Sequence, residues 1–137
     1  MNARSFFDTN VLVYTDDADA PAKSDRALDL WQEHRSQGLA VISIQVMQEY
    51  FCAATGKLHV DPAIAIEKLI LFGRADVVSP HADAVVSAAR LMVEHKLSFW
   101  DAMIVQMAMQ ADCEVLFSED MQAGRRFAGV QVVNPFA

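Results

Sequence analysis

The stretch SFWDAMIVQMA, residues 98–108, decides the fold that we expect for the rest of the chain. At helical spacing, Ile104 and Val105 follow Asp101 by three and four positions, so the carboxylate stands at the head of an apolar stripe. An ionised group aimed toward a core is costly to desolvate, so it must cap the helix, pair with another side chain or bind a cation. Ser98 and Asp101 also match a capping box, and this segment alone leaves a structural and a functional role open.

Length and composition favour one compact domain over residues 1–137. The sequence has 137 residues, of which 53% are hydrophobic and 21% charged, without repeats or low-complexity segments. No apolar run approaches the roughly 20 residues that span a bilayer, so we expect a cytoplasmic protein without a membrane contact. A net charge of −7 argues against a broad basic surface for non-specific nucleic-acid binding. It leaves nucleic acid open as a substrate, because cations held by gathered acids reverse the local charge.

Other polar residues carry no clear motif. Cys52 and Cys113 are far apart and lack a C-x-x-C pattern, so we expect buried free thiols. The histidines lack metal-ligand spacing and are expected at the surface or at helix caps, and three acids before Pro21 are expected to be solvated. These residues are His34, His59, His81 and His95, and Asp16, Asp17 and Asp19.

Hydrophobic periodicity predicts strands and helices in alternation. Strands are expected at residues 5–7, 39–42, 76–78, 113–117 and 130–133, with helices at 23–37, 44–55, 63–72, 81–95 and from 98 onward. Strands separated by helical segments favour a parallel sheet with helices on both faces. The predicted class is therefore α/β, a three-layer α/β/α sandwich with a mainly parallel central sheet.

Four acids occupy comparable places in this pattern. Asp8 and Asp120 each follow a strand, Glu49 lies at the edge of the apolar arc of its helix, and Asp101 begins a core helix. Each has an ordinary alternative role, such as an N-cap at Asp8 or a boundary residue at Glu49. Because the carboxyl ends of parallel strands share one edge, the four acids are expected to converge there, where they would repel one another unless a cation is present.

Oxygen ligands of this kind favour Mg²⁺ or Mn²⁺ over zinc or copper. The chemistry that suits such a site is phosphodiester hydrolysis, in which metal ions about 3.5–4 Å apart activate a water and stabilise the leaving oxygen. The sequence contains no G-x-S-x-G, G-x-x-x-x-G-K or G-x-G-x-x-G motif, so neither a serine nucleophile nor a nucleotide-binding loop is indicated.

Four segments, taken in order and spacing, closely resemble the PIN-domain ribonucleases, and within them the VapC-type toxins of bacterial toxin–antitoxin pairs. The segments are FDTNVLVY at residues 7–14, SIQVMQEY at 43–50, SFWDA at 98–102 and FSEDM at 117–121. The resemblance extends from Phe7 almost to the C-terminus. It implies a PIN-like fold and cleavage of single-stranded or looped RNA. It also implies a homodimer silenced by a small antitoxin, whose tail often inserts an arginine into the acidic pocket.

The resemblance also assigns site residues. Asp8, Glu49, Asp101 and Asp120 correspond to the acidic quartet of the family, which holds one or two Mg²⁺ or Mn²⁺ ions, with Asp8 and Asp101 as direct ligands. Asn10 and Ser118 correspond to polar positions that orient the carboxylates. For the fourth acid, a Ser or Thr two residues earlier selects Asp120, while the adjacent Glu119 is the alternative.

Three alternative functions remain at this point. A phosphoacceptor signalling domain shares the fold class and a Mg²⁺ pocket, but it needs adjacent early acids and a late strand-end lysine, which this sequence lacks. An aspartyl phosphatase needs a second Asp two residues after the first, where the sequence has Asn10. A PIN-like domain that binds RNA or protein without cutting is disfavoured only because all four acids are present.

Overall fold

The computed structural model describes residues 3–137 and contains a six-stranded sheet in the order β3-β2-β1-β4-β6-β5. The strands are β1 (Ser5–Phe7), β2 (Ala40–Ser43), β3 (Asp76–Val78), β4 (Val115–Phe117), β5 (Arg126–Phe127) and β6 (Val130–Val133). The helices are α1 (Thr9–Tyr14), α2 (Pro21–Ser36), α3 (Ile44–Gly56), α4 (Pro62–Phe72), α5 (Ala82–His95) and α6 (Phe99–Gln110).

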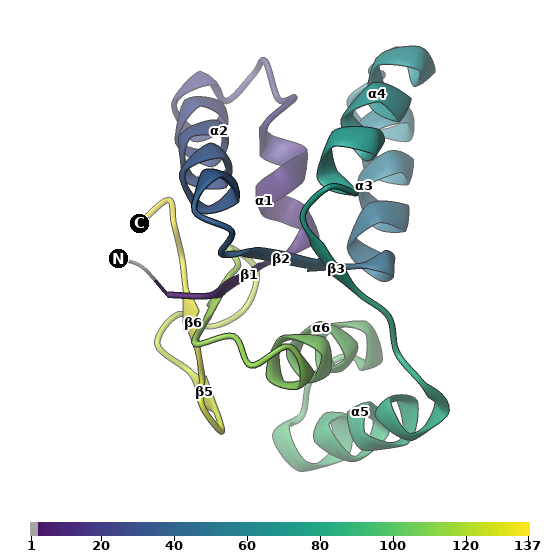
Figure 1. Ribbon diagram of the computed structural model, residues 1–137, viewed down its shortest axis with the longest axis vertical. Helices are drawn as coiled ribbons and strands as arrows, with labels where there is room; N and C mark the ends of the chain where they lie inside the picture. The colour runs from purple at the N-terminus through teal and green to yellow at the C-terminus, as the bar shows by residue number, and fades with distance from the viewer. Residues whose placement is uncertain (1–2) are drawn as a thin grey trace.

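The helices cover both faces of the sheet. Figure 1 shows α1 to α4 on one side of the sheet and α5 and α6 on the other, so the predicted three-layer α/β/α sandwich is confirmed. Strands β1, β2, β3, β4 and β6 pair in parallel, as the alternation of strands and helices predicted. Among residues 3–137, no helix is both long and apolar enough to cross a membrane.

The sequence did not reveal β5, which is the one antiparallel strand of the described sheet. Arg126 pairs with Gln131 and Phe127 pairs with Val130, so β5 and β6 form a tight hairpin at the edge of the sheet. The strand has only two residues, which is too short to produce a readable alternation of apolar and polar positions. The sheet is therefore mainly parallel, with this short antiparallel edge.

The centre of the sheet is buried on both faces. The side chains of Phe6 and Phe7 in β1 are fully inaccessible, and so is that of Leu116 in β4. Burying each such side chain stabilises the fold by about 1.5–3 kcal/mol, which accounts for the mainly apolar composition of these strands. The rigid pair β1 and β4 is the platform on which the polar residues that follow it are held.

Two polar residues continue these central strands at their carboxyl ends. The backbone N–H of Asp8 donates to the carbonyl of Phe117 at 2.9 Å, and the N–H of Ser118 donates to the carbonyl of Val133 at 3.0 Å. Asp8 and Ser118 therefore leave the sheet at the same edge, which is the edge where open α/β sheets bind ligands.

Three expectations for isolated polar residues were wrong in part. His34 is buried, because α2 presses its ring against Phe7 and Phe117 with ring centres 5.5 and 5.2 Å apart. Cys52 is exposed on α3 rather than buried, whereas Cys113 is buried, and both are free thiols.

Asp16 is also not solvated. Its carboxylate forms an ion pair with Lys68 of α4 at 2.8 Å and accepts a hydrogen bond from the hydroxyl of Tyr50 in α3. Only 13% of its side chain is exposed. The pair therefore joins the end of α1 to α3 and α4, and it holds these three helices together behind the polar edge of the sheet.

Candidate active site

A cleft of about 360 Å³ opens at the carboxyl edge of the sheet, and the structure brings the four predicted acids together along it. They come from separate elements: Asp8 follows β1, Glu49 lies in α3, Asp101 lies in the first turn of α6, and Asp120 follows β4. The remaining lining residues are Thr9, Asn10, Val13, Tyr14, Asp17, Ala53, Lys57, Leu58 and Glu119. The cleft is therefore strongly acidic.

Asp8 is the most enclosed of the four acids, with 6% of the residue exposed. It is the N-cap of α1, where Oδ1 accepts from the N–H of Thr9 at 2.7 Å. Oδ2 accepts from the hydroxyl of Ser118 at 2.8 Å and from the amide of Asn10 at 3.2 Å. These donors fix both carboxylate oxygens, so the expected capping role and a place in the cleft are combined in one residue.

Burial raises the pKa of Asp8 from 3.8 to about 6. The hydrogen bonds from Ser118 and from the N–H of Thr9 lower this pKa, and the charges of Asp101 and Glu49 raise it further. The coupling to Asp101 and Glu49 shows that these carboxylates are close enough to repel one another. A carboxyl group with such a pKa favours any cation that reaches the cleft at neutral pH.

Glu49 is held by two side chains. The hydroxyl of Thr9 donates to Oε1 at 2.6 Å, and the amide of Gln45, one turn earlier in α3, donates to Oε2 at 3.3 Å. The same Gln45 amide lies 3.3 Å from the carbonyl oxygen of Trp100, so α3 is joined to the start of α6. Glu49 is therefore oriented from both sides, although it lies outside the apolar arc of its helix.

Asp101 stands at the start of α6, where its N–H donates to Ser98 Oγ at 3.1 Å. This bond is the half of the predicted capping box that the N-cap serine provides. Burial raises the pKa of Asp101; the hydroxyl of Ser98 lowers it, and the charges of Asp120 and Glu49 raise it. Ser98 thus caps the helix, while the carboxylate of Asp101 faces the other acids of the cleft.

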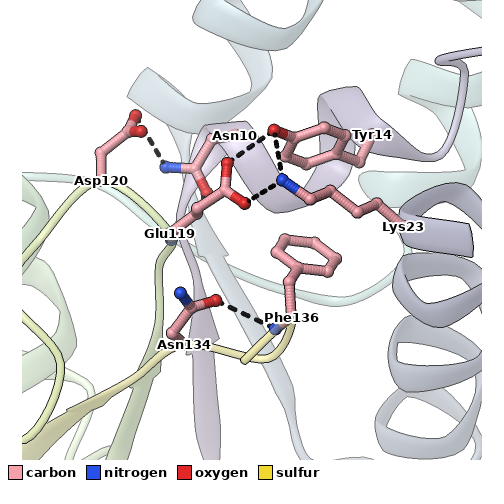
Figure 2. A network of polar contacts seen from close by, with 7 residues as sticks. All are labelled: Asn10, Tyr14, Lys23, Glu119, Asp120, Asn134 and Phe136. Atoms are coloured by element: carbon pink, nitrogen blue, oxygen red, sulfur yellow. Dashed lines mark hydrogen bonds and ion pairs between the residues drawn. The ribbon is translucent and has the colours of Figure 1, made fainter. Parts of the chain in front are cut away.

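Asn10 connects the two polar segments that follow β1 and β4. Its amide nitrogen donates to Asp8 at 3.2 Å and to Asp120 at 3.1 Å, and its amide oxygen accepts from the N–H of Glu119 at 3.1 Å. Figure 2 shows Asn10 between the two acids Glu119 and Asp120. The predicted orienting position is thus one amide that holds both strand-end segments.

Glu119 and Asp120 have different surroundings, which bears on the choice between them. Glu119 accepts from the hydroxyl of Tyr14 and pairs with Lys23 of α2 at 2.6 Å, as Figure 2 shows. The hydrogen bond from Lys23, followed by that from Tyr14, lowers the pKa of Glu119. Asp120 has the amide of Asn10 as its only hydrogen-bond partner within residues 3–137. Of the two, Asp120 is the carboxylate with oxygens left for a ligand.

The polar side-chain atoms of the cleft are almost all oxygens, which are the ligands that Mg²⁺ and Mn²⁺ prefer. No group of three or more His, Cys, Asp or Glu side chains within residues 3–137 is drawn tightly enough to form a complete metal cage. Mg²⁺ does not need one, because it keeps several waters and takes one or two carboxylates directly. The buried Oε1 of Gln45 has no hydrogen-bond partner in the described part of the chain, so an added donor beside Glu49 would satisfy it. The oxygen-only cleft therefore fits a partly hydrated hard cation.

Several residues that shape the cleft were not predicted from the sequence. Thr9 and Gln45 orient Glu49, and Lys23 and Tyr14 hold Glu119. Gln45 could have been found, because it precedes Glu49 by four positions and therefore shares its helix face. The other three contact partners from different elements, and only the assembled fold brings those partners close.

The fold and the cleft together define an α/β protein with an acidic pocket built at the carboxyl ends of parallel strands. The family model described as the PIN domain matches residues 5–128, and the chain belongs to the PIN-domain family. A comparison with curated proteins finds no match.

Solved structures share this fold. VapC20 of Mycobacterium tuberculosis, a sarcin–ricin loop cleaving toxin, has a TM-score of 0.69 and 21% identity, with 85% of this chain and 91% of that chain covered. A toxin–antitoxin complex from Klebsiella pneumoniae has a TM-score of 0.69 and 21% identity, covering 96% and 97%. PAE2754 from Pyrobaculum aerophilum has a TM-score of 0.61 and 22% identity, covering 88% and 82%.

Proposed function

We propose that this chain is a Mg²⁺- or Mn²⁺-dependent endoribonuclease and the toxin of a toxin–antitoxin pair. The observation that carries the proposal is the convergence of Asp8, Glu49, Asp101 and Asp120 on one cleft of a PIN-family protein. Four carboxylates in one cleft destabilise the fold by mutual repulsion, so a cation that neutralises them is the natural reason for their presence.

Asp8 and Asp101 would hold the cation directly, and Glu49 and Asp120 would do so partly through water. When bound, the cation supplies an activated water and balances the charge that develops on the phosphodiester oxygens. The chain's own residues keep the carboxylates in place: Ser118 and Asn10 fix Asp8, as described above. A carboxylate held by two or three donors does not have to be reordered when the substrate arrives, which lowers the cost of binding.

The toxin role is proposed from kinship and charge. VapC20 is described as a toxin, and the Klebsiella pneumoniae structure is a toxin–antitoxin complex. An acidic cleft suits an antitoxin whose arginine enters it, because the guanidinium group pairs with carboxylates in a bidentate manner. We include in the proposal a homodimer, an RNA substrate and action in the cytoplasm.

The test is cleavage by the purified full chain, freed of any antitoxin. The RNA panel contains total RNA, a transfer-RNA pool and a hairpin with the sarcin–ricin loop sequence, the loop that VapC20 is described as cleaving. We expect cleavage with Mg²⁺ or Mn²⁺, loss of cleavage on chelation, and loss in Asp101→Asn. The matched control is Asp112→Asn, which makes the same change at an exposed position with a φ of 56° that Asn tolerates.

Two results would contradict the proposal. Undiminished cleavage by Asp101→Asn would mean that the acidic cleft does not carry out the reaction. Cleavage that persists in chelator would mean that no divalent cation is required. Stable labelling of an aspartate by acetyl phosphate would instead support the signalling domain. A cleft that binds Mg²⁺ and RNA but never cuts would support the non-cleaving PIN-like alternative.

A further inference from the structure

Trp100 is the one aromatic among the large apolar side chains that are strongly exposed in residues 3–137, with 61% of its surface accessible. The other exposed large apolar side chains are aliphatic, and most of them lie on α4 and α5. Trp100 instead lies in the first turn of α6 and directly precedes Asp101, which lines the acidic cleft. A large aromatic exposed beside a charged cleft is unfavourable in the free protein, because burial of its surface is the favoured state.

The position of Trp100 is fixed by its neighbours. Its ring meets the ring of Phe99 edge-on, with ring centres 5.0 Å apart and an angle of 80° between the ring planes. Its carbonyl oxygen lies 3.3 Å from the amide of Gln45, which also contacts Glu49. The backbone of Trp100 is therefore tied to both α3 and α6, the helices that carry Glu49 and Asp101.

The charge of the cleft limits how RNA could be held there. The chain has a net charge of −7, and Lys57 is the only Lys or Arg that lines the cleft within residues 3–137. Lys23, nearby, is already paired with Glu119. Contacts from basic side chains to phosphates would therefore be few, and contacts that do not depend on charge would add to the affinity that a bound cation provides. Base stacking on an aromatic ring is such a contact, and it tolerates any base.

We infer that Trp100 is a stacking platform for one unpaired base of the RNA whose phosphate enters the cleft beside Asp101. The inference rests on the proposed function, because it names a contact of the same site with its substrate. The competing occupant is a protein surface, either an antitoxin or a second copy of the chain. An antitoxin can be held by an arginine that pairs with the acids of the cleft, whereas RNA meets a lining with a single lysine and therefore gains more from a contact that does not depend on charge.

The first experiment is a fluorescence titration of the full chain with a single-stranded 12-nucleotide RNA, in Ca²⁺ to slow hydrolysis while keeping the cleft neutralised. Saturation is established separately from the anisotropy of a labelled copy of the RNA. Stacking of a base on Trp100 quenches its emission, while Trp31 is buried in the core and serves as an internal background. We expect quenching in the wild type and none in Trp100→Phe, which keeps a platform but removes the fluorophore.

The second experiment compares the steady-state cleavage of the same RNA by variants. We expect Trp100→Ala to raise KM by roughly 5- to 150-fold with kcat changed only a few-fold, the range expected for the loss of one stacked base. Trp100→Phe should keep KM within a few-fold of the wild type. Val93→Ala is the control, because Val93 is 75% exposed on α5 and lies outside the cleft lining.

The outcomes separate this inference from the proposed function. If the wild type cleaves RNA and Trp100→Ala keeps its KM, or if saturating RNA leaves the emission unchanged, the stacking role is wrong and the nuclease stands. If Trp100→Ala keeps its KM but shifts the monomer–dimer equilibrium in sedimentation, Trp100 is a protein contact and the inference is overturned. If the wild type neither binds nor cleaves RNA, both proposals fail.

Discussion

Replacing Asp8 by Asn tests whether the buried carboxylate in the cleft lowers the free energy of unfolding. Asp8 is an N-cap, and Asn caps helices about as well as Asp. The substitution therefore removes the charge with little change of shape. We expect Asp8→Asn to unfold at higher urea concentration than the wild type at pH 7 in chelator, and to lose RNA cleavage completely when Mg²⁺ is supplied.

The magnitude follows from the pKa of Asp8, which burial raises from 3.8 to about 6. Each unit of pKa corresponds to about 1.4 kcal/mol, so keeping Asp8 ionised at pH 7 costs the folded protein about 3 kcal/mol. Asn has one acceptor oxygen where Asp8 has two, and the lost hydrogen bond on the side of Ser118 and Asn10 costs about 1 kcal/mol. The expected net gain is about 1–2 kcal/mol at pH 7.

The sign of the pH dependence is fixed by the same shift. Between pH 3.8 and 6 the folded protein keeps a proton on Asp8 that the unfolded chain has lost, so the contribution of Asp8 to stability falls as pH rises through this window. Asp8→Asn lacks this loss. Its advantage should therefore be present at pH 7 and largely lost at pH 4, where the folded protein keeps the proton on Asp8 and the unfolded chain is only partly ionised there.

The assay is urea unfolding followed by circular dichroism at pH 4 and pH 7, both with chelator. The control is Asp25→Asn, which makes the same change at an exposed position of α2 and should alter stability by less than about 0.5 kcal/mol. An Asp8→Asn protein that is less stable than the wild type at pH 7, or whose difference from the wild type is the same at both pH values, would refute the reasoning.

Three further predictions concern the surroundings of the cleft. Glu119→Gln should keep the cleavage rate within a few-fold of the wild type, because Lys23 and Tyr14 already engage Glu119. Asp120→Asn should lower the cleavage rate at least about tenfold. Equal losses for the two variants in a single-turnover assay would contradict this difference. Lys68→Met should lower the free energy of unfolding by about 3 kcal/mol, because it leaves a carboxylate with 13% exposure unpaired; adding Asp16→Asn should restore part of the loss in urea melts. The affinity for Mg²⁺ should fall as pH drops below about 6, where the buried carboxyl after β1 is protonated, and calorimetry that gives the same affinity at pH 5 and pH 7 would contradict the expected competition.

The general architecture could be predicted because it depends on the hydrophobic periodicity of each segment and on the alternation of strands and helices along the chain. Five strands were expected, and all five occur in the structure with small changes of their bounds. The convergence of Asp8 and Asp120 followed from one rule, that parallel strands end at a common edge. The capping box of Ser98 and Asp101 was one of the two roles that the sequence left open, and the structure shows that Ser98 does cap this helix.

What could not be predicted depends on partners from distant parts of the chain. Asp16 was expected to be solvated, because it lies in a loop that ends at Pro21, yet Lys68 and Tyr50 reach it from other helices. The strand order, and with it the neighbour of each strand, is not encoded in periodicity. Thr9 illustrates the same limit at the cleft, since its partner Glu49 lies 40 positions away.

The order of the strands in the sheet also sets when the cleft can exist. Strands β1, β2 and β3 are consecutive in the chain and adjacent in the sheet. Strand β4 also pairs with β1, but it is synthesised only after β2 and β3. The hydrogen bond from Ser118 to Asp8 joins residues 110 positions apart. At about 5–20 residues per second, roughly 5–20 s pass between the synthesis of these two residues. During that interval Asp8 lacks the hydrogen bond from Ser118, so the acidic cleft is complete only after most of the chain has been synthesised.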